Sequence, residues 1–469
     1  MTNTPTPKDA EQSHLAHAPD PHPRGPIGWI VTGSLATGLL AALLLVTVPF
    51  VPPDESNIRG AVLCGFALGW AILVVLSVRF TDQPQLWATA PALFMAVGGL
   101  LLVVFGSPVN GVINWVWPPT LLALVIWMTV RAHRRLRSWT RYWLIYPLFA
   151  LLALASIGGG YETVTEAVDA SAHPMVGQLI DVGGHSLRLN CTGSGSPTVV
   201  LEPGAGEMSA DFGWTTPAVA RDTRVCVYDR AGRGWSQPSD AAQDGTQIAT
   251  DLHTLLHRGD IAGPYVLAGH SFGGLYVQAF AALYPDEVAG MVLIDSTAPK
   301  FTATPRATPR ATPRATPTED GDSYNIMSRV SALVSGLARF GLGRIYGQFD
   351  YGSLPPASRD EARASVAKAD QLESTINEYV EANTSMEQAA TLETLANKPL
   401  IVLTAGSGST ADWPAKQQAM AALSTNTAHR VIAGATHASF VSDEKYAAVT
   451  SEAILDVVTA VRSGAPLSR

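Results

Sequence analysis

The serine best placed for nucleophilic chemistry is Ser271, in the sequence GHSFG at residues 269–273. An apolar run at 265–268 precedes it, and a helical pattern begins at Gly274. A nucleophile on a tight turn between a strand and a helix needs glycine on both sides, because the backbone is strained and neighbouring strands crowd it. The chain has 41 glycines, so the pattern alone is weak. Its position between a strand and a helix favours Ser271 as a nucleophile over a glycine-rich turn of no function.

A histidine late in the chain is needed to activate this serine. Serine is a poor nucleophile at neutral pH and requires a base within hydrogen-bond reach. With the chain order serine, acid, histidine, the candidates are the two histidines that follow residue 398. His429 stands at the start of the last predicted strand and is better explained as structural. His437 follows that strand in a loop, so we predict that His437 is the base.

Two aspartates compete for the role of the acid that orients His437. Asp295 comes directly after the predicted strand at 290–294, and Asp412 is the first carboxylate after the predicted strand at 400–404. The position of Asp412 is late for a group at a strand end. An aspartate at a strand end can also simply cap the following turn. Geometry therefore favours Asp295 and leaves Asp412 open.

The negative oxygen that develops when serine attacks a carbonyl requires two fixed N–H donors. Phe272 supplies one, since it follows Ser271 at the N-terminus of a helix, where the helix dipole helps. Ala205, in the turn EPGAG at 202–206, is predicted to supply the other. The alternative for this turn is a glycine-rich loop without a ligand.

A parallel sheet wrapped by helices would position these residues. From Val176 onward, short β-rich runs alternate with helical patterns, which is typical of an α/β domain. The eight predicted strands are 178–181, 186–191, 198–202, 224–228, 265–268, 290–294, 400–404 and 430–432, and the predicted helices include 248–258, 274–284 and 443–461.

Between the sixth and seventh strands, residues 297–398 show patterns at helical spacing and are predicted to form an inserted lid. Within them the unit Thr-Pro-Arg-Ala recurs at 304–317. Frequent proline removes backbone donors and forces extended conformations, so we expect a flexible loop there. Its arginines could bind an anionic surface, but a tolerated expansion explains the repeat better.

These residues resemble the α/β-hydrolase superfamily, and the segment YDRAGRGWS at 228–236 is similar to one found in its serine esterases and related lactonase-like and peptidase-like members. The resemblance covers residues 176–461 and implies an eight-stranded fold, a lid, a Ser-acid-His triad and no cofactor. The family's acid most often follows the seventh strand, and in some members, such as haloalkane dehalogenases, the sixth. One departure is Pro-Gly at 203–204, where His-Gly is frequent. Asp229 and Arg230 are expected to be a structural pair near the site.

The N-terminal part of the chain is predicted to be a membrane region. The chain is 47% hydrophobic and only 15% charged, and the apolar excess lies at 27–160. Five segments there approach the roughly 20 residues that cross a bilayer. They are 27–48, 58–78, 86–105, 112–130 and the shortest, 142–157. Residues 1–26 are predicted to be a disordered cytoplasmic tail, 161–175 a linker and 176–465 the hydrolase domain.

The orientation follows from the connection at 131–141, which is crowded with arginine. Such clusters stay cytoplasmic. The fifth span leaves from this connection, so the hydrolase domain should emerge on the other side. We expect a multi-pass protein of the cell membrane with an extracytoplasmic hydrolase domain, whereas an even number of spans would reverse the orientation.

The expected role of the five spans is an anchor. Transporters and channels usually place ionisable residues at membrane depth, and such residues are almost absent from these segments. A net charge of −8 without a basic stripe argues against nucleic acid as a partner. The expected partners are the lipid bilayer and a small-molecule or lipid-like acyl substrate.

Cys191 and Cys226 fall on the second and fourth predicted strands, which the family resemblance makes neighbours. A disulfide is permitted if the domain is extracytoplasmic, and two buried thiols are the alternative. Cys64 lies in a predicted span and is expected to be unpaired.

The function predicted from these residues is hydrolysis of an acyl ester through a serine-bound intermediate. The same groups could pass the acyl group to an alcohol or cleave an amide. The alternative from another class is a catalytically silent, membrane-tethered sensor or binding domain. The nucleophile, base and oxyanion turn occur in the right order, which argues against a silent domain.

Overall fold

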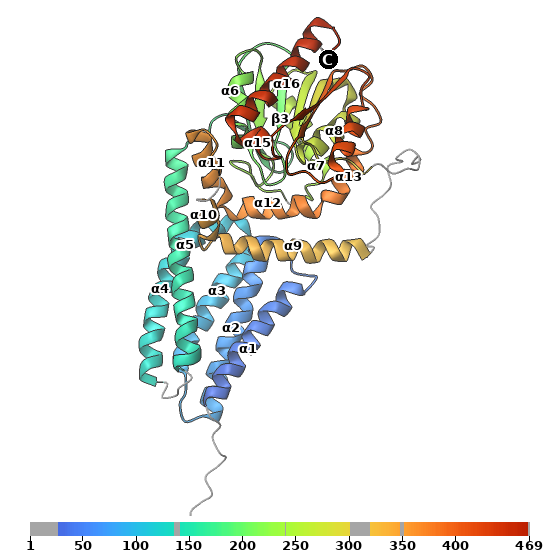
Figure 1. The fold of residues 1–469 in the computed structure, drawn as a ribbon. Coiled ribbons are helices and arrows are strands. Elements are labelled where there is room, and N and C mark those ends of the chain that lie inside the picture. Colours follow the sequence, from blue (N-terminus) through green and yellow to red (C-terminus); the bar gives the residue numbers. More distant parts are fainter. Residues whose placement is uncertain (1–26, 136–140, 240, 301–318, 348–350, 468–469) are drawn as a thin grey trace, which may run out of the picture.

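The computed structural model describes residues 27–135, 141–239, 241–300, 319–347 and 351–467. The tail predicted at 1–26 and the repeat at 304–317 lie outside the described residues. The described chain forms a bundle of long helices with an α/β domain at one end (Figure 1). A helical insertion in the α/β domain lies between these two parts (Figure 1).

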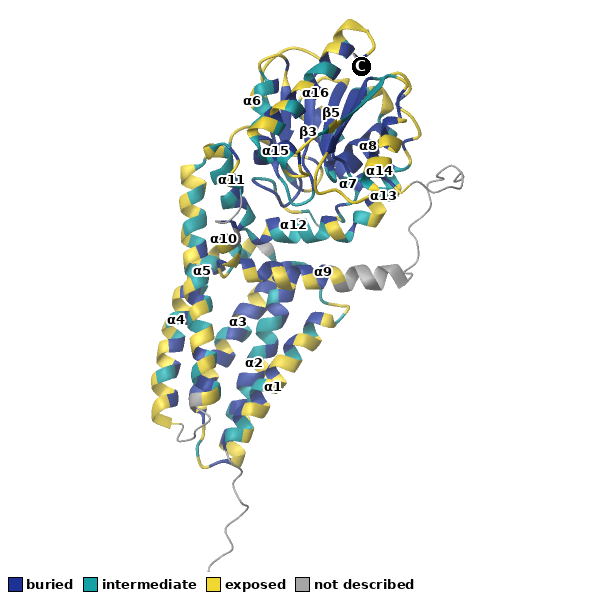
Figure 2. Cartoon of the chain, in the orientation of Figure 1, coloured by how far each residue is buried: buried dark blue, intermediate teal, exposed yellow. Residues whose placement is uncertain are grey.

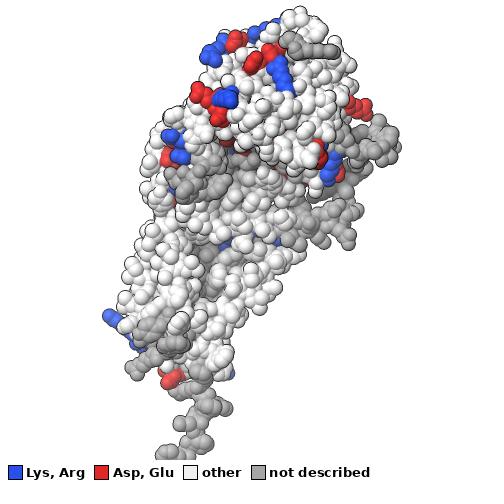
Figure 3. Space-filling view, viewed as in Figure 1, with Lys and Arg blue, Asp and Glu red and all other residues white. Residues whose placement is uncertain are grey.

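Within the described ranges, five helices of the bundle are long and apolar enough to cross a membrane, in agreement with the five predicted spans. They are α1 (Ile27–Thr47), α2 (Glu55–Phe80), α3 (Thr89–Phe105), α4 (Asn110–Arg135) and α5 (Tyr146–Ala172), and the short η1 (Leu86–Ala88), η2 (Ser107–Val109) and η3 (Arg141–Ile145) join them. Large apolar side chains such as Leu39, Leu93 and Leu151 are exposed on the bundle surface. Figure 3 shows few charged side chains along the visible face of the bundle.

Small residues let α1 and α2 approach closely. A Cβ added to Gly65 would lie 2.3 Å from the Cα of Ala42, and one added to Gly69 would lie 2.7 Å from the Cα of Gly38. Lipid tails are as apolar as these helices, so helices in a bilayer associate through close van der Waals packing. The small side chains permit that packing.

Helix α5 differs from the sequence prediction at its C-terminal end. It continues to Ala172 and so includes most of the linker predicted at 161–175. The insertion holds this polar end, because Arg344 bonds Glu162 at 2.9 Å and Asp169 at 2.6 Å. Asp169 and Arg344 are 175 positions apart in the chain, so no local pattern could reveal the contact.

Helix α2 carries a charged residue in a span expected to be nearly free of them. Arg59 lies one turn from the start of α2 and bonds Glu55 at 3.3 Å. Ionisable groups in such helices are tolerated where they are paired with one another. The pairing of Arg59 with Glu55 meets that condition.

In the described part of the chain, eight strands form one sheet in the order β1-β2-β4-β3-β5-β6-β7-β8. They are β1 (Gln178–Asp181), β2 (Ser186–Thr192), β3 (Val199–Glu202), β4 (Val225–Tyr228), β5 (Tyr265–His270), β6 (Val288–Ile294), β7 (Leu400–Ala405) and β8 (Thr427–Ile432). β2 pairs antiparallel with β1 and β4, and the other pairs are parallel. The predicted α/β fold with an eight-stranded, mostly parallel sheet is confirmed.

Helices cover both faces of this sheet, which is why its central strands are apolar throughout rather than alternating. The helices α7 (Gly245–Arg258), α8 (Gly273–Leu283) and α14 (Trp413–Ala421) pack on one face, and α6 (Thr215–Val219), α15 (Ser439–Ser442) and α16 (Glu444–Ser463) pack on the other. Leu267 faces the first layer and its neighbour Ala268 the second. Figure 2 shows the sheet as a deeply buried layer.

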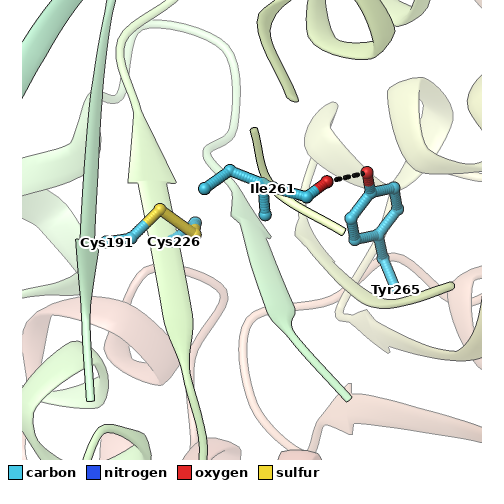
Figure 4. The surroundings of a disulfide bond; sticks show 4 residues. All are labelled: Cys191, Cys226, Ile261 and Tyr265. Carbon is cyan, nitrogen blue, oxygen red and sulfur yellow. Dashed lines mark hydrogen bonds between the residues drawn. A yellow bond between two sulfur atoms is a disulfide. The ribbon is translucent and has the colours of Figure 1, made fainter. Parts of the chain in front are cut away.

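Cys191 of β2 and Cys226 of β4 form a disulfide, shown in Figure 4. The two residues are directly opposite in the strand pairing, with Cα atoms 4.0 Å apart. Of the two alternatives that the sequence leaves open, the structure has the bond. Cys64 is free, as expected.

The insertion is built from helices, as predicted for 297–398. It contains α9 (Glu319–Ala338), α10 (Leu342–Gly347), α11 (Pro356–Val366), α12 (Ala369–Val380) and α13 (Ala382–Ala389). Helix α9 lies across the end of the bundle, and α12 lies between α9 and the α/β domain (Figure 1). Arg329 of α9 donates to the carbonyls of Val46 at 2.8 Å and Val51 at 2.6 Å. The insertion therefore contacts the bundle as well as the α/β domain.

Candidate active site

Ser271 lies on a sharp turn between β5 and α8. Its φ of 51° is in the left-handed region, which residues other than glycine rarely adopt. A Cβ on Gly269 would lie 2.4 Å from the carbonyl oxygen of Gly273, and a Cβ on Gly273 would lie 2.2 Å from that of Glu202. Close backbone contacts therefore require both glycines. The turn leaves Ser271 partly exposed.

A hydrogen bond joins His437 to Asp295, with His437 Nδ1 and Asp295 Oδ2 2.7 Å apart. Asp295 directly follows β6, and its other oxygen accepts from the backbone N–H of Ala405 at 2.9 Å and the indole N–H of Trp413 at 2.7 Å. Burial alone would raise the pKa of Asp295, but these hydrogen bonds outweigh burial and hold the pKa below its ordinary value. The carboxylate is therefore ionised and fixed in place.

His437 reaches the turn that carries Ser271. Its carbonyl oxygen is 3.0 Å from His270 Nε2, and the two imidazole centroids are 4.7 Å apart. Within the described part of the chain, no hydrogen bond joins Ser271 to His437. Such bonds are often long in an enzyme without substrate and shorten when substrate binds. The side chain of His437 is 46% exposed, so a substrate can approach it.

Backbone N–H groups from two elements lie near Ser271. Phe272 leads into α8, and a Cβ on Gly204 would lie 2.9 Å from Ser271 Cβ, so the turn after β3 passes beside the serine. Among the described residues, no protein acceptor takes the N–H of Phe272 or of Ala205. Two unpaired donors beside a nucleophile are what a developing negative oxygen requires.

Asp412 is occupied elsewhere. Its exposed carboxylate accepts from the Thr410 hydroxyl at 2.6 Å and pairs with Lys416 Nζ at 2.6 Å. The hydrogen bonds from Lys416 and then Thr410 lower the pKa of Asp412 to about 2. His429 on β8 also has another partner, because its Nε2 lies 2.8 Å from the hydroxyl of Thr404 on the neighbouring strand β7. Of the two aspartates, the structure brings Asp295 to His437.

A second carboxylate–imidazole pair, absent from the sequence prediction, lies against the first. Two oxygens of Glu207 are 2.8 Å and 2.9 Å from His270 Nδ1, and one of them accepts the backbone N–H of Gly204 at 2.6 Å. Glu207 directly follows the turn at 202–206, and His270 precedes Ser271. The turn at 202–206 and the GHSFG sequence are both visible in the chain, but their positions do not predict that Glu207 contacts His270.

A buried ionic cluster lies behind the oxyanion turn. Arg230 is 2.7 Å from Glu202 and 2.8 Å from Glu378, and Arg233 is 2.7 Å from Glu378. Burial raises the pKa of Glu202 to about 7 against the opposing effect of Arg230. Because Glu378 comes from the insertion, this cluster attaches α12 to the strand ends.

The expected pair of Asp229 with Arg230 does not form. Asp229 is 3.1 Å from Arg188 of β2 instead, and it also accepts the backbone N–H of Ser209 at 3.0 Å. Arg230 has Glu378 as a partner, 148 positions away. Asp229 and Arg230 are adjacent in sequence, but Asp229 pairs with Arg188 whereas Arg230 pairs with Glu378.

One group of side chains could hold a metal ion. His253 and His257 of α7 and Glu287 of η5 (Pro285–Glu287) each offer a ligand atom, and these atoms all lie within 4.8 Å of one another. They also hydrogen-bond without a metal, since Glu287 is 3.0 Å from His253 and 3.1 Å from His257. None of the three belongs to the Ser271 group.

The similarity of this chain to a known protein family lies in its α/β domain. The model of the alpha/beta hydrolase fold family matches residues 197–444. The chain is 30% identical over 137 residues to a 2-hydroxy-6-oxo-2,4-heptadienoate hydrolase of Pseudomonas putida, covering 28% of this chain and 48% of that protein. It is 32% identical over 164 residues to the dihydrolipoyllysine-residue acetyltransferase component of an acetoin cleaving system of Pseudomonas putida, covering 32% of this chain and 44% of that one.

The chain spans less than half the length of the first curated relatives it matches. One is an uncharacterised protein of Schizosaccharomyces pombe, 29% identical over 235 residues, covering 49% of this chain and 40% of that protein. Among solved structures, an enol-lactonase from Burkholderia xenovorans LB400 is 18% identical, covers 60% of this chain and 100% of its own, and has a TM-score of 0.45.

Proposed function

Because the chain belongs to the α/β-hydrolase fold family, we propose that it is a membrane-anchored serine hydrolase that cleaves an ester-type bond through an acyl-serine intermediate. The observation that carries the proposal is the 2.7 Å hydrogen bond between His437 and Asp295 beside the strained turn of Ser271. Serine, histidine and aspartate in these positions supply a nucleophile, a base and the acid that orients the base. The relative named as a hydrolase supports the same class of reaction.

In the proposed reaction, Ser271 Oγ attacks the ester carbonyl carbon while His437 Nε2 takes the serine proton. The N–H groups of Ala205 and Phe272 stabilise the negative oxygen. The tetrahedral intermediate then expels the alcohol, which receives the proton from His437. Water attacks the acyl-serine with His437 again acting as base, which releases the acid and restores Ser271. Asp295 keeps Nδ1 protonated so that Nε2 faces the serine.

The membrane part of the proposal is an anchor with the catalytic domain on the extracytoplasmic side. Five apolar helices of sufficient length support the anchor. The disulfide between Cys191 and Cys226 supports the orientation, because disulfides persist mainly in oxidising compartments. A substrate at or near the bilayer, either a small acyl ester or a lipid-like one, fits this placement.

A fluorophosphonate probe tests the proposal on the full-length protein in detergent. It should label the wild type and fail to label Ser271→Ala. The matched control is Ser407→Ala, which removes an exposed serine hydroxyl near the end of β7 and should leave labelling unchanged. Absence of labelling in a wild type shown to be folded by circular dichroism contradicts the proposal and favours a silent binding domain.

Acyl transfer to an alcohol is the second candidate, because one relative is named as an acetyltransferase component. Both reactions share the acyl-serine, so fluorophosphonate labelling does not separate them. Turnover of an acyl ester with and without an added alcohol does. Hydrolysis predicts free acid as the main product in both cases, whereas a new ester as the main product identifies a transferase.

A further inference from the structure

A cavity of about 270 Å³ lies where the bundle meets the insertion. Its walls come from α2, α3, α4 and α5 of the bundle and from α9 and the beginning of α12 of the insertion. None of Ser271, His437 and Asp295 lines it. The cavity is therefore separate from the candidate active site.

The part of the wall inside the bundle is mainly apolar. It includes Leu63, Leu102, Trp117 and Leu121, and α9 adds Leu337. Apolar cavities exclude water and take apolar ligands, and about 150 Å³ suffices for benzene. By that measure, about 270 Å³ holds roughly ten carbon atoms of a chain.

Charged side chains line the same cavity near the insertion. They are the cationic Arg59, Arg339 and Lys368 and the anionic Glu162, Glu166 and Asp370. Arg339 pairs with Glu55 and lies 3.6 Å from Asp370, so the charges largely compensate one another. This charged rim can contact a polar group, but its balance gives no preference for a net charge on that group.

An apolar chamber with a balanced, charged rim offers partners to both parts of a lipid, the apolar chain and the polar head group. Leu63, Leu102 and Leu121 belong to helices that are long and apolar enough to cross a membrane, so hydrocarbon from the bilayer is the available occupant. We propose that this cavity binds one acyl chain of a membrane lipid, with an uncharged or zwitterionic head group at the rim formed by Arg59 and Arg339. The proposal concerns binding and does not depend on the chemistry of Ser271.

Helix α12 connects this site to the active site. Asp370 near its beginning lines the cavity, and the ring of Tyr379 near its end is 5.4 Å from that of Phe272, the residue after Ser271. Nine residues of helix separate the two contacts, roughly 14 Å. A bound lipid thus contacts the helix whose other end borders the proposed oxyanion donor.

The test uses a phosphatidylcholine that carries a photoactivatable diazirine midway along one acyl chain. Full-length protein is reconstituted in bilayers that contain this probe, irradiated, digested and mapped by mass spectrometry. We expect labelled peptides from the cavity wall, including Leu102 and Leu121, which are both buried. Labelling confined to outward-facing positions such as Leu39 and Leu93 overturns the proposal.

A cavity-filling variant makes the test specific. Gly336 lines the cavity, and the atoms nearest to a Cβ added there are those of the Arg59 side chain, at 3.6 Å, and of Glu55, at 3.9 Å, so Gly336→Leu extends into the cavity. Each excluded methylene should weaken binding about fourfold, so we expect labelling at Leu121 to fall by about tenfold or more. The control Gly33→Leu adds the same side chain where nothing lies within 4 Å and should label like the wild type.

Two further variants keep the result decisive. If Gly336→Leu does not fold, Gly159→Leu reaches the cavity from α5, where the nearest atoms to an added Cβ are 3.4 Å and 3.6 Å away. Unchanged labelling at Leu121 in a folded filling variant refutes the lipid site. Ser271→Ala should label like the wild type, so failure of the lipid site and failure of the hydrolase proposal are distinguishable.

Discussion

At the scale of single residues, the two candidate acids differ in what their carboxylates contact. Asp295 is 1% exposed and receives hydrogen bonds from three groups that are distant in sequence. Asp412 is exposed and bonds Thr410 and Lys416, its neighbours in the chain. Only the first arrangement can hold an imidazole in one tautomer and orientation.

Replacing each aspartate by asparagine separates the two roles. Asp295→Asn keeps the shape but removes the charge that stabilises the imidazolium, so turnover of an activated acyl ester should fall by about 10⁴-fold. Asp412→Asn should keep near-normal turnover and serves as the matched control. Near-normal turnover in Asp295→Asn with loss in Asp412→Asn would reject the assignment.

Glu207 and His270 make the stability of the fold depend on pH. Burial alone would lower the pKa of His270, but Glu207 outweighs it and raises the pKa. Burial alone would raise the pKa of Glu207, but His270 outweighs it and lowers the pKa. The histidine contribution is complete below about pH 6.5 and is lost as pH rises through its folded pKa. The glutamate contribution is complete above about pH 4.5 and is lost as pH falls through its folded pKa.

The variant Glu207→Gln removes the charge from this pair. The loss of stability relative to wild type should be largest between about pH 4.5 and 6.5, where both contributions are complete, and should shrink as pH rises through the raised pKa of His270. Urea unfolding of both proteins across this range measures it. A difference that stays constant with pH would show that the pair acts only as neutral hydrogen bonds.

At the scale of elements, α12 is held against the strand ends by charge. Glu378 is 1% exposed and pairs with Arg230 and Arg233. Removing one partner of a buried ion pair leaves the other charge uncompensated, which costs about 3–5 kcal/mol. Glu378→Ala should therefore lower the melting temperature clearly. The control Glu387→Ala on α13 changes an exposed glutamate and should alter stability by no more than about 0.5 kcal/mol. Equal melting temperatures in the two variants would contradict a stabilising role for the ionic cluster of Glu378, Arg230 and Arg233.

The elements that depend on local pattern could be predicted from the sequence. The apolar run of β5 followed by glycines on both sides of Ser271 located the turn, and the position of Asp295 at the end of β6 located a carboxylate that contacts His437. Contacts between distant segments could not be predicted. Glu378 and Arg230 lie 148 positions apart, and the strand pattern says nothing about which insertion residue reaches the sheet.

At the scale of the whole molecule, the two ends of the bundle differ. The C-terminal end of α4, where the arginine-rich connection at 131–141 begins, lies at the end of the bundle away from the α/β domain (Figure 1). If this connection is cytoplasmic, a reporter active only in the cytoplasm should work when fused at 131–141 and be silent after Arg469. Activity after Arg469 and silence at 131–141 would mean that the proposed orientation is inverted.

The continuous helix α5 fixes both the orientation of the α/β domain and its distance from the rest of the bundle. Glu162 and Asp169 are close to two helical turns apart, so both face Arg344. One residue inserted before Glu162 would turn everything beyond it by about 100° relative to the rest of the bundle, so the insertion would lose its contacts with α1 and α2, such as that of Arg339 with Glu55. Seven inserted residues would restore the direction but move the α/β domain about 10 Å further from the bundle. The length of α5 therefore determines both the rotation of the α/β domain about the helix axis and its distance from the bundle, and only certain lengths satisfy both.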